Sequence, residues 1–172
     1  MTRPAISVGI PTFWAWRRLN LCVAALRAQS LPAEDFDIVV VDNDDDPLPE
    51  SQRPADVTYV HEPEGFSYAA RNAGLKHAQG KIIAFTDSDC IPNPLWLENA
   101  CDHLRQNPKV DLLGGRIELF STHDSLAARY DIVFGLNQEL YFKNWNSFAT
   151  ANLIVRREAI DRINGFNSKM ES

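Results

Sequence analysis

Residues 82–90 read IIAFTDSDC, a mostly apolar run that leads directly into two aspartates, Asp87 and Asp89. The apolar part has the length and composition of a buried β-strand. Residues two apart in an extended segment point to the same side, so the pattern predicts that both carboxylates face one ligand. Two carboxylates held close together repel each other unless a cation lies between them or one of them takes up a proton. The stretch therefore predicts a strand that ends at a cation site.

The elements around this strand alternate between strand-like and helix-like patterns. Leu19, Cys22, Val23 and Leu26 share one helical face, and FDIVVV at 36–41 is a continuous apolar run, typical of a parallel strand covered on both faces. The order β-α-β-β-α-β-α predicts one α/β domain, residues 1–172, with a mostly parallel central sheet flanked by helices. We expect strands at 5–10 (stopped by Pro11), 36–41, 57–60 and 81–86, and helices at 17–29, 67–79 (N-cap Ser67, stop Gly80) and from Asn93-Pro94 to just before Pro108.

Composition narrows the class of ligand. The chain has 172 residues, 45% of them hydrophobic, and a net charge of −6 at pH 7, with no cluster of lysines and arginines. That charge argues against binding along a nucleic-acid backbone, so an anionic ligand would need a metal or local amides. Three cysteines without C-x-x-C spacing indicate neither a disulfide framework nor a zinc site and fit a reduced, cytosolic environment. No apolar run long enough to cross a bilayer is present, although binding at a membrane surface stays open.

The expected sheet places other polar residues near Asp87 and Asp89. In open α/β sheets, ligands bind outside the carboxyl ends of the strands. Pro11 and Thr12, Asp42, and the segment Asp87-Ser88-Asp89 all follow such ends. Hard divalent ions such as Mg²⁺ or Mn²⁺ are held by one or two carboxylates, with substrate phosphates completing the shell. The sequence therefore predicts a site for a metal-bound diphosphate at this edge.

At this point the chain resembles the family 2 glycosyltransferases, which have the GT-A fold and invert the configuration of the transferred sugar. The similar segments appear in the family's order and spacing, and the A-R-N-x-G-x-x-x-A-x-G run joined to D-S-D is a specific signature. They are SVGIPTF (7–13), FDIVVVDN (36–43), the run from 65 to 97 and TANLIVRREAIDRINGFN (150–167).

The resemblance implies a donor site for a nucleotide-diphospho-sugar in residues 1–107. By position, Pro11 and Thr12 would line the base pocket, Asp42 would hydrogen-bond the base or ribose, and Arg71 would contact the nucleotide portion. Asp42 could serve uracil, guanine or thymine, and we expect a UDP-sugar.

The resemblance also implies a metal site and the beginning of an acceptor site. Asp89 would be the main ligand of Mn²⁺ or Mg²⁺, while Asp87 would bind ribose, sugar, the metal or its water, with Ser88 between them. Residues 108–172 would begin the acceptor-binding half, with the segment around Asn152 and Arg156 at its border.

The general base implied by the resemblance is missing from its usual place. In the family it is the aspartate of a Glu-Asp pair shortly after a GGF-x-E segment, whereas this chain reads INGFNSKMES and stops at Ser172. Glu171 is a weak substitute, because terminal residues fray. We expect the base beyond Ser172, in a longer protein of which this chain is a part. Asn164 replaces the first glycine of GGF, and asparagine tolerates the positive φ such a turn needs.

The resulting hypothesis is metal-dependent, inverting transfer of a sugar to a glycan or lipid-linked acceptor, for a cell-envelope or exported polysaccharide, in the cytoplasm or at the inner face of the cytoplasmic membrane. One alternative is a non-catalytic sugar-nucleotide-binding module. Another is a phosphatase of the haloacid dehalogenase type, in which Cys90 would stand where Thr or Val is expected. The aromatic residues between 134 and 148 indicate core or a subunit interface more than an acceptor or lipid platform.

Overall fold

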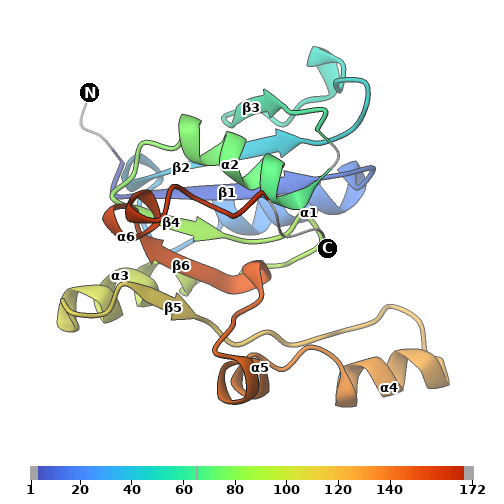
Figure 1. The fold of residues 1–172 in the computed structure, drawn as a ribbon. Helices are drawn as coiled ribbons and strands as arrows, with labels where there is room; N and C mark the ends of the chain where they lie inside the picture. The colour runs from blue at the N-terminus through green and yellow to red at the C-terminus, as the bar shows by residue number, and fades with distance from the viewer. Residues whose placement is uncertain (1–3, 65, 169–172) are drawn as a thin grey trace.

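Six β-strands form one mixed sheet with helices on both faces in the computed structural model, which describes residues 4–64 and 66–168 (Figure 1). The strand order is β3-β2-β1-β4-β6-β5. The strands are β1 (Ile6–Thr12), β2 (Phe36–Asp42), β3 (Thr58–His61), β4 (Ile82–Phe85), β5 (Leu112–Gly114) and β6 (Leu153–Arg156).

The helices form two layers and an outlying pair. Helices α1 and α3 pack on one face of the sheet, and α2 and α6 on the other. Helices α4 and α5 lie beyond the sheet, away from the other four (Figure 1). The helices are α1 (Trp16–Arg27), α2 (Ser67–His77), α3 (Trp96–Gln106), α4 (Leu126–Phe134), α5 (Gln138–Trp145) and α6 (Arg157–Arg162), with 3-10 turns at Ala33–Asp35, Glu50–Gln52 and Thr150–Asn152.

Parallel pairing around β1 sets the direction of the sheet. Strand β1 pairs in parallel with β2, from Ile6 opposite Phe36 to Thr12 opposite Asp42, and in parallel with β4 on its other side. The predicted mostly parallel sheet is therefore confirmed. Strand β6 runs antiparallel to both β4 and β5, and neither β5 nor β6 was among the strands expected from apolar runs.

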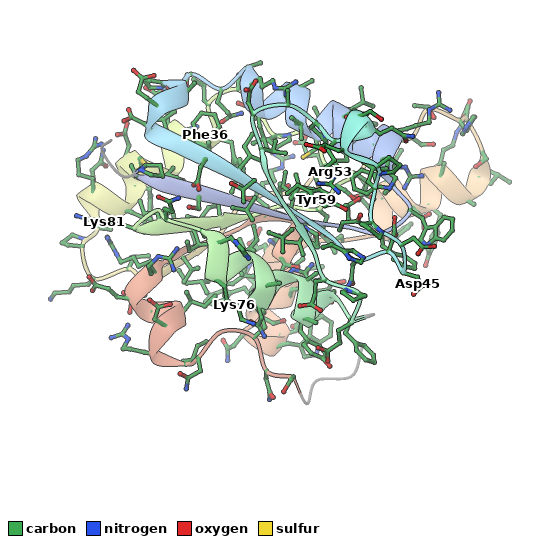
Figure 2. The ribbon with its side chains drawn as sticks, turned by 90° about the horizontal axis from the view of Figure 1, so that it is seen from above. Phe36, Asp45, Arg53, Tyr59, Lys76 and Lys81 are labelled. Carbon is green, nitrogen blue, oxygen red and sulfur yellow. The ribbon has the colours of Figure 1, made fainter. Side chains whose placement is uncertain are left out.

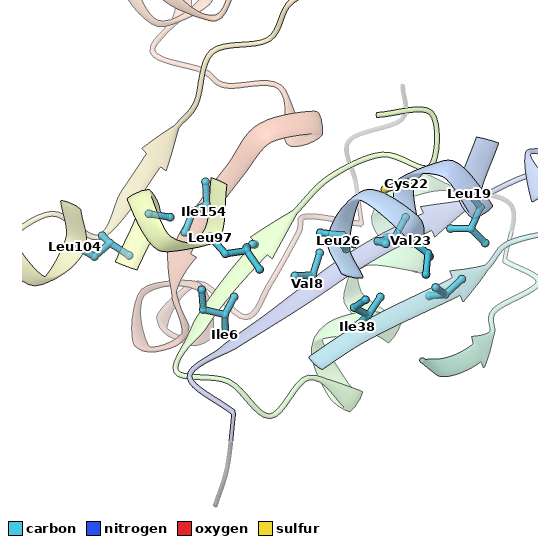
Figure 3. Close-up of a cluster of buried hydrophobic side chains, with 14 residues drawn as sticks. Ile6, Val8, Leu19, Cys22, Val23, Leu26, Ile38, Leu97, Leu104 and Ile154 are labelled. Carbon is cyan, nitrogen blue, oxygen red and sulfur yellow. The ribbon is translucent and has the colours of Figure 1, made fainter. Parts of the chain in front are cut away.

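The larger core cluster lies between the sheet and helices α1 and α3. Leu19, Cys22, Val23 and Leu26, the predicted apolar face, are buried against strand residues such as Val8 (Figure 3). Alternate strand residues point to the other face, where Val39 and Val41 meet the alanines of α2, and Phe85 meets the α6 side. Both faces of the central strands are therefore shielded from water, which is why their sequences are continuously apolar.

Most expected boundaries shift by one or two residues, and three of the differences have an identifiable local cause. Strand β1 continues through Pro11 to Thr12. The carbonyl of Gly9 accepts from Thr86 N on the β4 side, and Pro11, two residues later, faces that same side where β4 has already ended. Its missing N–H therefore removes no bond from the sheet.

The two helix starts also shift. Phe66, not Ser67, is the N-cap residue of α2, and none of the described side chains caps that helix. Asn93 does not open α3, which begins at Trp96. Its side-chain oxygen accepts from Leu95 N (3.0 Å) and its carbonyl from Trp96 N (2.9 Å), so Asn93 forms a separate turn before the helix.

No helix in the described parts of the chain is long and apolar enough to span a bilayer.

Gly80, in the loop between α2 and β4, gives a test of how this loop packs against β1. A Cβ at Gly80 would lie 2.5 Å from the backbone of Ile6 and Ser7, so Gly80→Ala should lower the free energy of unfolding by about 3 kcal/mol, through forced backbone movement. Gly74→Ala is the matched control: its Cβ would lie 3.2 Å from one methyl of Val41, and a gain in helix propensity of about 1 kcal/mol offsets that contact. Chemical denaturation measures both; equal losses would contradict this packing.

Candidate functional site

The carboxyl ends of β1, β2 and β4 meet at one edge of the sheet. Thr12 lies opposite Asp42 in register, and β4 ends beside β1 at Phe85. Figure 2 shows the start of β2, at Phe36, and Lys81, just before β4, far from Asp45, which follows the end of β2. The predicted residues Pro11, Thr12, Asp42 and 87–89 therefore come to a common edge, as the strand pattern indicated.

Asp42 is fully buried and already hydrogen-bonded on both oxygens. Its Oδ1 accepts from Asp44 N (3.1 Å), and its Oδ2 accepts from Leu48 N (3.0 Å) and from the hydroxyl of Tyr59. Burial, followed by the hydrogen bond to Asp42, raises the pKa of Tyr59 to about 12. Asp42 thus orders the loop after β2, and a ligand reaches this carboxylate only if one of these donors moves.

Asp44 is a site residue that sequence reasoning missed. The run 42–46 was interpreted as a solvated loop apart from Asp42, but Asp44 is buried as well. Its Oδ1 accepts from Trp14 N (2.7 Å) and its Oδ2 from the indole N–H of Trp16 (3.1 Å). The Asp44 carboxylate therefore ties the loop after β2 to the loop after β1. Trp16 was the available signal, because a half-buried indole N–H needs an acceptor.

Arg71 and Asp87 form an ion pair across the edge. Arg71 Nη2 lies 3.1 Å from Asp87 Oδ1, and the Arg71 side chain is only 11% exposed. Burial raises the pKa of Asp87 above its ordinary value, while the Arg71 guanidinium acts in the opposite direction. Both residues were predicted as ligand contacts, but not as partners of each other.

Asp89 faces the solvent more openly than Asp87 does. Its carboxylate is 55% exposed, and its ion pair, with Arg18, has a 3.7 Å separation between Nη1 and Oδ2. Cys90 N donates to the carbonyl of Asp87 (3.0 Å), so this segment is a tight turn. The extended geometry expected for Asp87 and Asp89 is wrong, because β4 ends at Phe85, before the aspartates. Within the turn, Ser88 is buried.

Two buried polar atoms beside these carboxylates have no hydrogen-bond partner among the described residues. They are Thr12 Oγ1 and Arg71 Nε. Buried polar groups are nearly always hydrogen-bonded, and exceptions need an explanation such as a bound ion, water or ligand. The edge therefore has one unsatisfied hydroxyl and one unsatisfied guanidinium N–H available to a bound molecule.

The residues at this edge fit a hard divalent cation that shares its ligands with a substrate. No group of three or more His, Cys, Asp or Glu side chains suited to a metal occurs within residues 4–64 and 66–168. Asp89 offers an open carboxylate and Asp87 a second one close by in the chain. Mg²⁺ and Mn²⁺ are commonly held in this way, by one or two carboxylates with phosphates and waters completing the shell.

The turn after α6 is fixed to α2 next to Arg71. Asn164 has φ 59° and Gly165 φ 81°, which confirms that asparagine can replace the first glycine there. Asn72 donates through Nδ2 to the carbonyl of Phe166 (2.9 Å) and accepts from Phe166 N (2.8 Å). The ring of Phe166 packs edge-on against Phe85, with centroids 5.1 Å apart. Glu171, the weak candidate base, lies outside the described residues.

The two residues expected to border an acceptor lie at opposite ends of β6. Asn152 immediately precedes β6 on the site side, where it accepts from the indole N–H of Trp96 (2.8 Å) and donates to the carbonyl of Arg116 (2.9 Å). Arg156 pairs in register with Ile82, at the start of β4. The prediction for Arg156 is wrong, because β6 runs antiparallel and carries it to the opposite edge of the sheet.

The aromatic segment after residue 130 is largely exposed. Phe134 is 70% exposed and Trp145 is 65% exposed, and α4 has no buried residue. The interpretation as core is therefore wrong for Phe134 and Trp145, whereas Phe148 is half-buried and packs against the core cluster on the α6 side of the sheet. A subunit interface at the exposed rings stays a prediction. Helical spacing alone could not show that α4 and α5 lie away from the sheet.

Comparison with known proteins gives a consistent result. A family model described as glycosyl transferase family 2 matches residues 7–163. Glycosyltransferase AglE from Haloferax volcanii is 31% identical over 179 residues, which is 99% of this chain and 59% of that protein. Chondroitin synthase from Escherichia coli is 30% identical over 118 residues, 64% of this chain and 17% of that protein. The chain thus spans less than two thirds of the length of these relatives.

Solved structures show the same fold. A mannosyltransferase from Pyrobaculum calidifontis in complex with GDP-Man and Mn²⁺ matches with a TM-score of 0.72 at 24% identity, covering 98% of this chain and 49% of that one. TarS 1-349 from S. aureus matches with a TM-score of 0.72 at 19% identity, covering 97% of this chain and 51% of that one. The fold class expected from the sequence is confirmed. The phosphatase alternative finds no support in these comparisons.

Trp14 gives a test of strain at the site. Its φ of 51° is unfavourable for a bulky residue, and its side chain is 75% exposed. Trp14→Asn should therefore raise the free energy of unfolding by about 0.5–1 kcal/mol, because asparagine tolerates this conformation. Phe13→Asn is the control, since Phe13 is also exposed (60%) and shares the same ring contact without a positive φ. Denaturant titration measures both variants, and an equal change in the two would show that Trp14 is not strained.

Proposed function

Because the chain belongs to glycosyl transferase family 2, we propose that the edge formed by β1, β2 and β4 binds a nucleotide-diphospho-sugar and that the protein transfers its sugar to an acceptor. One observation carries this proposal: the turn with Asp87 and Asp89 lies at the same edge as Thr12 and Arg71, which each have a buried polar atom without a partner in the part of the chain that the structure describes. The hydrogen-bond acceptors of such a ligand would pair with the Thr12 hydroxyl and the Arg71 Nε–H, and its diphosphate would share a cation with Asp87 and Asp89.

The nucleotide part of the donor is proposed to lie between the ends of β1 and β2. Pro11 and Thr12 would line the base pocket, and Arg71 would donate its free Nε–H to the nucleotide. Asp42 would bind the base or ribose directly if its hydrogen bond with Leu48 or Tyr59 breaks. Otherwise it would act indirectly, by ordering the loop after β2. A UDP-sugar is the proposed donor, with GDP- and dTDP-sugars as the alternatives that a binding experiment separates.

Asp89 is proposed as the main ligand of Mn²⁺ or Mg²⁺, with Asp87 as the second carboxylate. When bound, such an ion would stabilise the negative charge on the diphosphate leaving group. Arg71 fixes the position of the Asp87 carboxylate through their 3.1 Å ion pair, and its own low exposure keeps that pair in place. Asp89 remains open for a metal because its contact with Arg18 is long and exposed.

The acceptor and the base belong to the second half of the proposed site. Residues 1–107 would hold the donor, and residues 108–172 would begin the acceptor half. Inversion needs a carboxylate base within hydrogen-bond reach of the acceptor hydroxyl, and that base is proposed to lie after Ser172. The acceptor is proposed to be a glycan or a lipid-linked sugar, used in the cytoplasm or at the inner face of the cytoplasmic membrane.

A non-catalytic donor-binding module is the second candidate. Asp42 and Asp44 are buried and hydrogen-bonded, and Asp87 and Asp89 are proposed as metal ligands, so none of these four is proposed as the base. Assays for donor hydrolysis and for transfer to a glycan separate the candidates. Release of the nucleotide from the donor supports the enzyme. Because the base is proposed to lie after Ser172, the module is supported only if a longer protein that includes the following residues also binds the donor without release or transfer.

The donor site can be tested through Asp89. Asp89→Ala should weaken Mn²⁺-dependent binding of UDP by more than about 100-fold, because loss of even an outer-shell partner of a metal costs 10–100-fold. Asp45→Ala is the matched control, since Asp45 is an exposed aspartate at the same edge that is not proposed to touch the metal. Calorimetric titration measures both. Unchanged binding by Asp89→Ala would remove Asp89 from the site.

A further inference from the structure

The first turn of α1 has an unusual charge pattern. Arg17 and Arg18 stand next to each other there, no acidic residue accompanies them, and the N-cap residue Ala15 offers no side-chain acceptor. The N-terminal end of a helix carries a partial positive charge, which makes arginine unfavourable at that end. An anion from outside the helix would therefore stabilise the two arginines in this turn.

In the structure Arg18 takes its anion from the Asp87–Asp89 turn. Arg18 Nη1 lies 3.7 Å from Asp89 Oδ2, too far for a hydrogen bond, and the two side chains are 71% and 55% exposed. Exposed ion pairs of this kind contribute little to stability. The nearby Arg71–Asp87 pair is different, because it is 3.1 Å long and its arginine is 11% exposed. The turn thus has one fixed arginine and one that can leave.

Asp89 is also the carboxylate proposed to hold the metal, so the following step rests on the proposed function. A divalent cation at Asp89 would neutralise the carboxylate charge that attracts Arg18 in its absence. The diphosphate would arrive at the same place together with the cation, and it carries more negative charge than the carboxylate does. An arginine binds phosphate oxygens well, through several N–H donors.

We propose that Arg18 is a positioning residue that exchanges partners. Without ligand it pairs with Asp89 and acts as the counter-charge of the carboxylate proposed to hold the metal. When metal and diphosphate bind, it moves from Asp89 to the diphosphate. Arg18 then opposes binding of the metal alone and favours binding of the diphosphate, so that neither ligand is held well without the other.

This exchange predicts effects of opposite sign from one substitution. Arg18→Ala should bind Mn²⁺ alone about two- to fivefold more tightly, since an exposed pair that competes for Asp89 is lost. The same variant should bind UDP with Mn²⁺ about tenfold more weakly, since a charge-assisted contact is lost. UMP, which lacks the second phosphate, should be affected less than UDP.

Arg17→Ala is the matched control, because it removes the same charge from the same helical turn and Arg17 forms none of the ion pairs found in the described residues. It reports the general effect of net charge on cation and anion binding. Arg18→Lys keeps the charge without the planar guanidinium and should lie between the native chain and Arg18→Ala. Thermal unfolding checks that all three variants fold.

Titrations of the native chain and the variants with Mn²⁺, with UDP plus Mn²⁺ and with UMP plus Mn²⁺ decide the matter. Larger shifts for Arg18→Ala than for Arg17→Ala, tighter for Mn²⁺ and weaker for UDP, support the exchange. Equal shifts in the two variants, while the native chain binds UDP with Mn²⁺, overturn the exchange and leave the donor site standing. If the native chain binds none of UDP, GDP and dTDP in the presence of Mn²⁺, both the partner exchange and the proposed donor site are overturned.

Discussion

The parallel pairing of β1 with both β2 and β4 is the constraint on which the site depends. It aligns Thr12 with Asp42 on one side and ends β4 beside β1 on the other, so three chain segments open at one edge. Apolar side chains from α1 cover one face of these strands (Figure 3), and those of α2 cover the other, so the edge is where a ligand can approach them. Because the core is built from the strands and helices, the loops at this edge can carry polar residues without weakening the core packing.

The aspartates at this edge have two different tasks. Asp42 and Asp44 are buried and accept hydrogen bonds from the loops after β1 and β2, so they build the walls of the site. Asp87 and Asp89 lie in the turn after β4, where the carboxylates are more exposed and each pairs with an arginine. One pair is short and sheltered, whereas the other is long and exposed. That difference suits a site in which one carboxylate is fixed and the other is free to change its partner.

The sequence predicted strands β1 to β4 and the edge, because both depend on local patterns, but it did not predict β5 and β6. Continuous apolar runs marked β2 and β4, and the polar residues that follow them had to gather where parallel strands end. Asp44 was missed because its two donors come from Trp14 in the loop after β1 and from Trp16 at the start of α1, contacts that spacing within 42–46 cannot show. Arg156 was misplaced because the antiparallel direction of β6 has no signature in its own four residues. The exposed aromatics of α4 and α5 resemble core residues for the same reason: their burial depends on what lies beside them.

Calorimetric titration of the chain with UDP, GDP and dTDP, each with and without Mn²⁺, tests the donor site most directly. The proposed site predicts that one of these nucleotides binds and that its binding requires Mn²⁺, since the carboxylates of Asp87 and Asp89 would otherwise repel the diphosphate. Absence of binding by all three nucleotides, or equal binding with and without the metal, would contradict a metal-dependent donor site at this edge of the sheet.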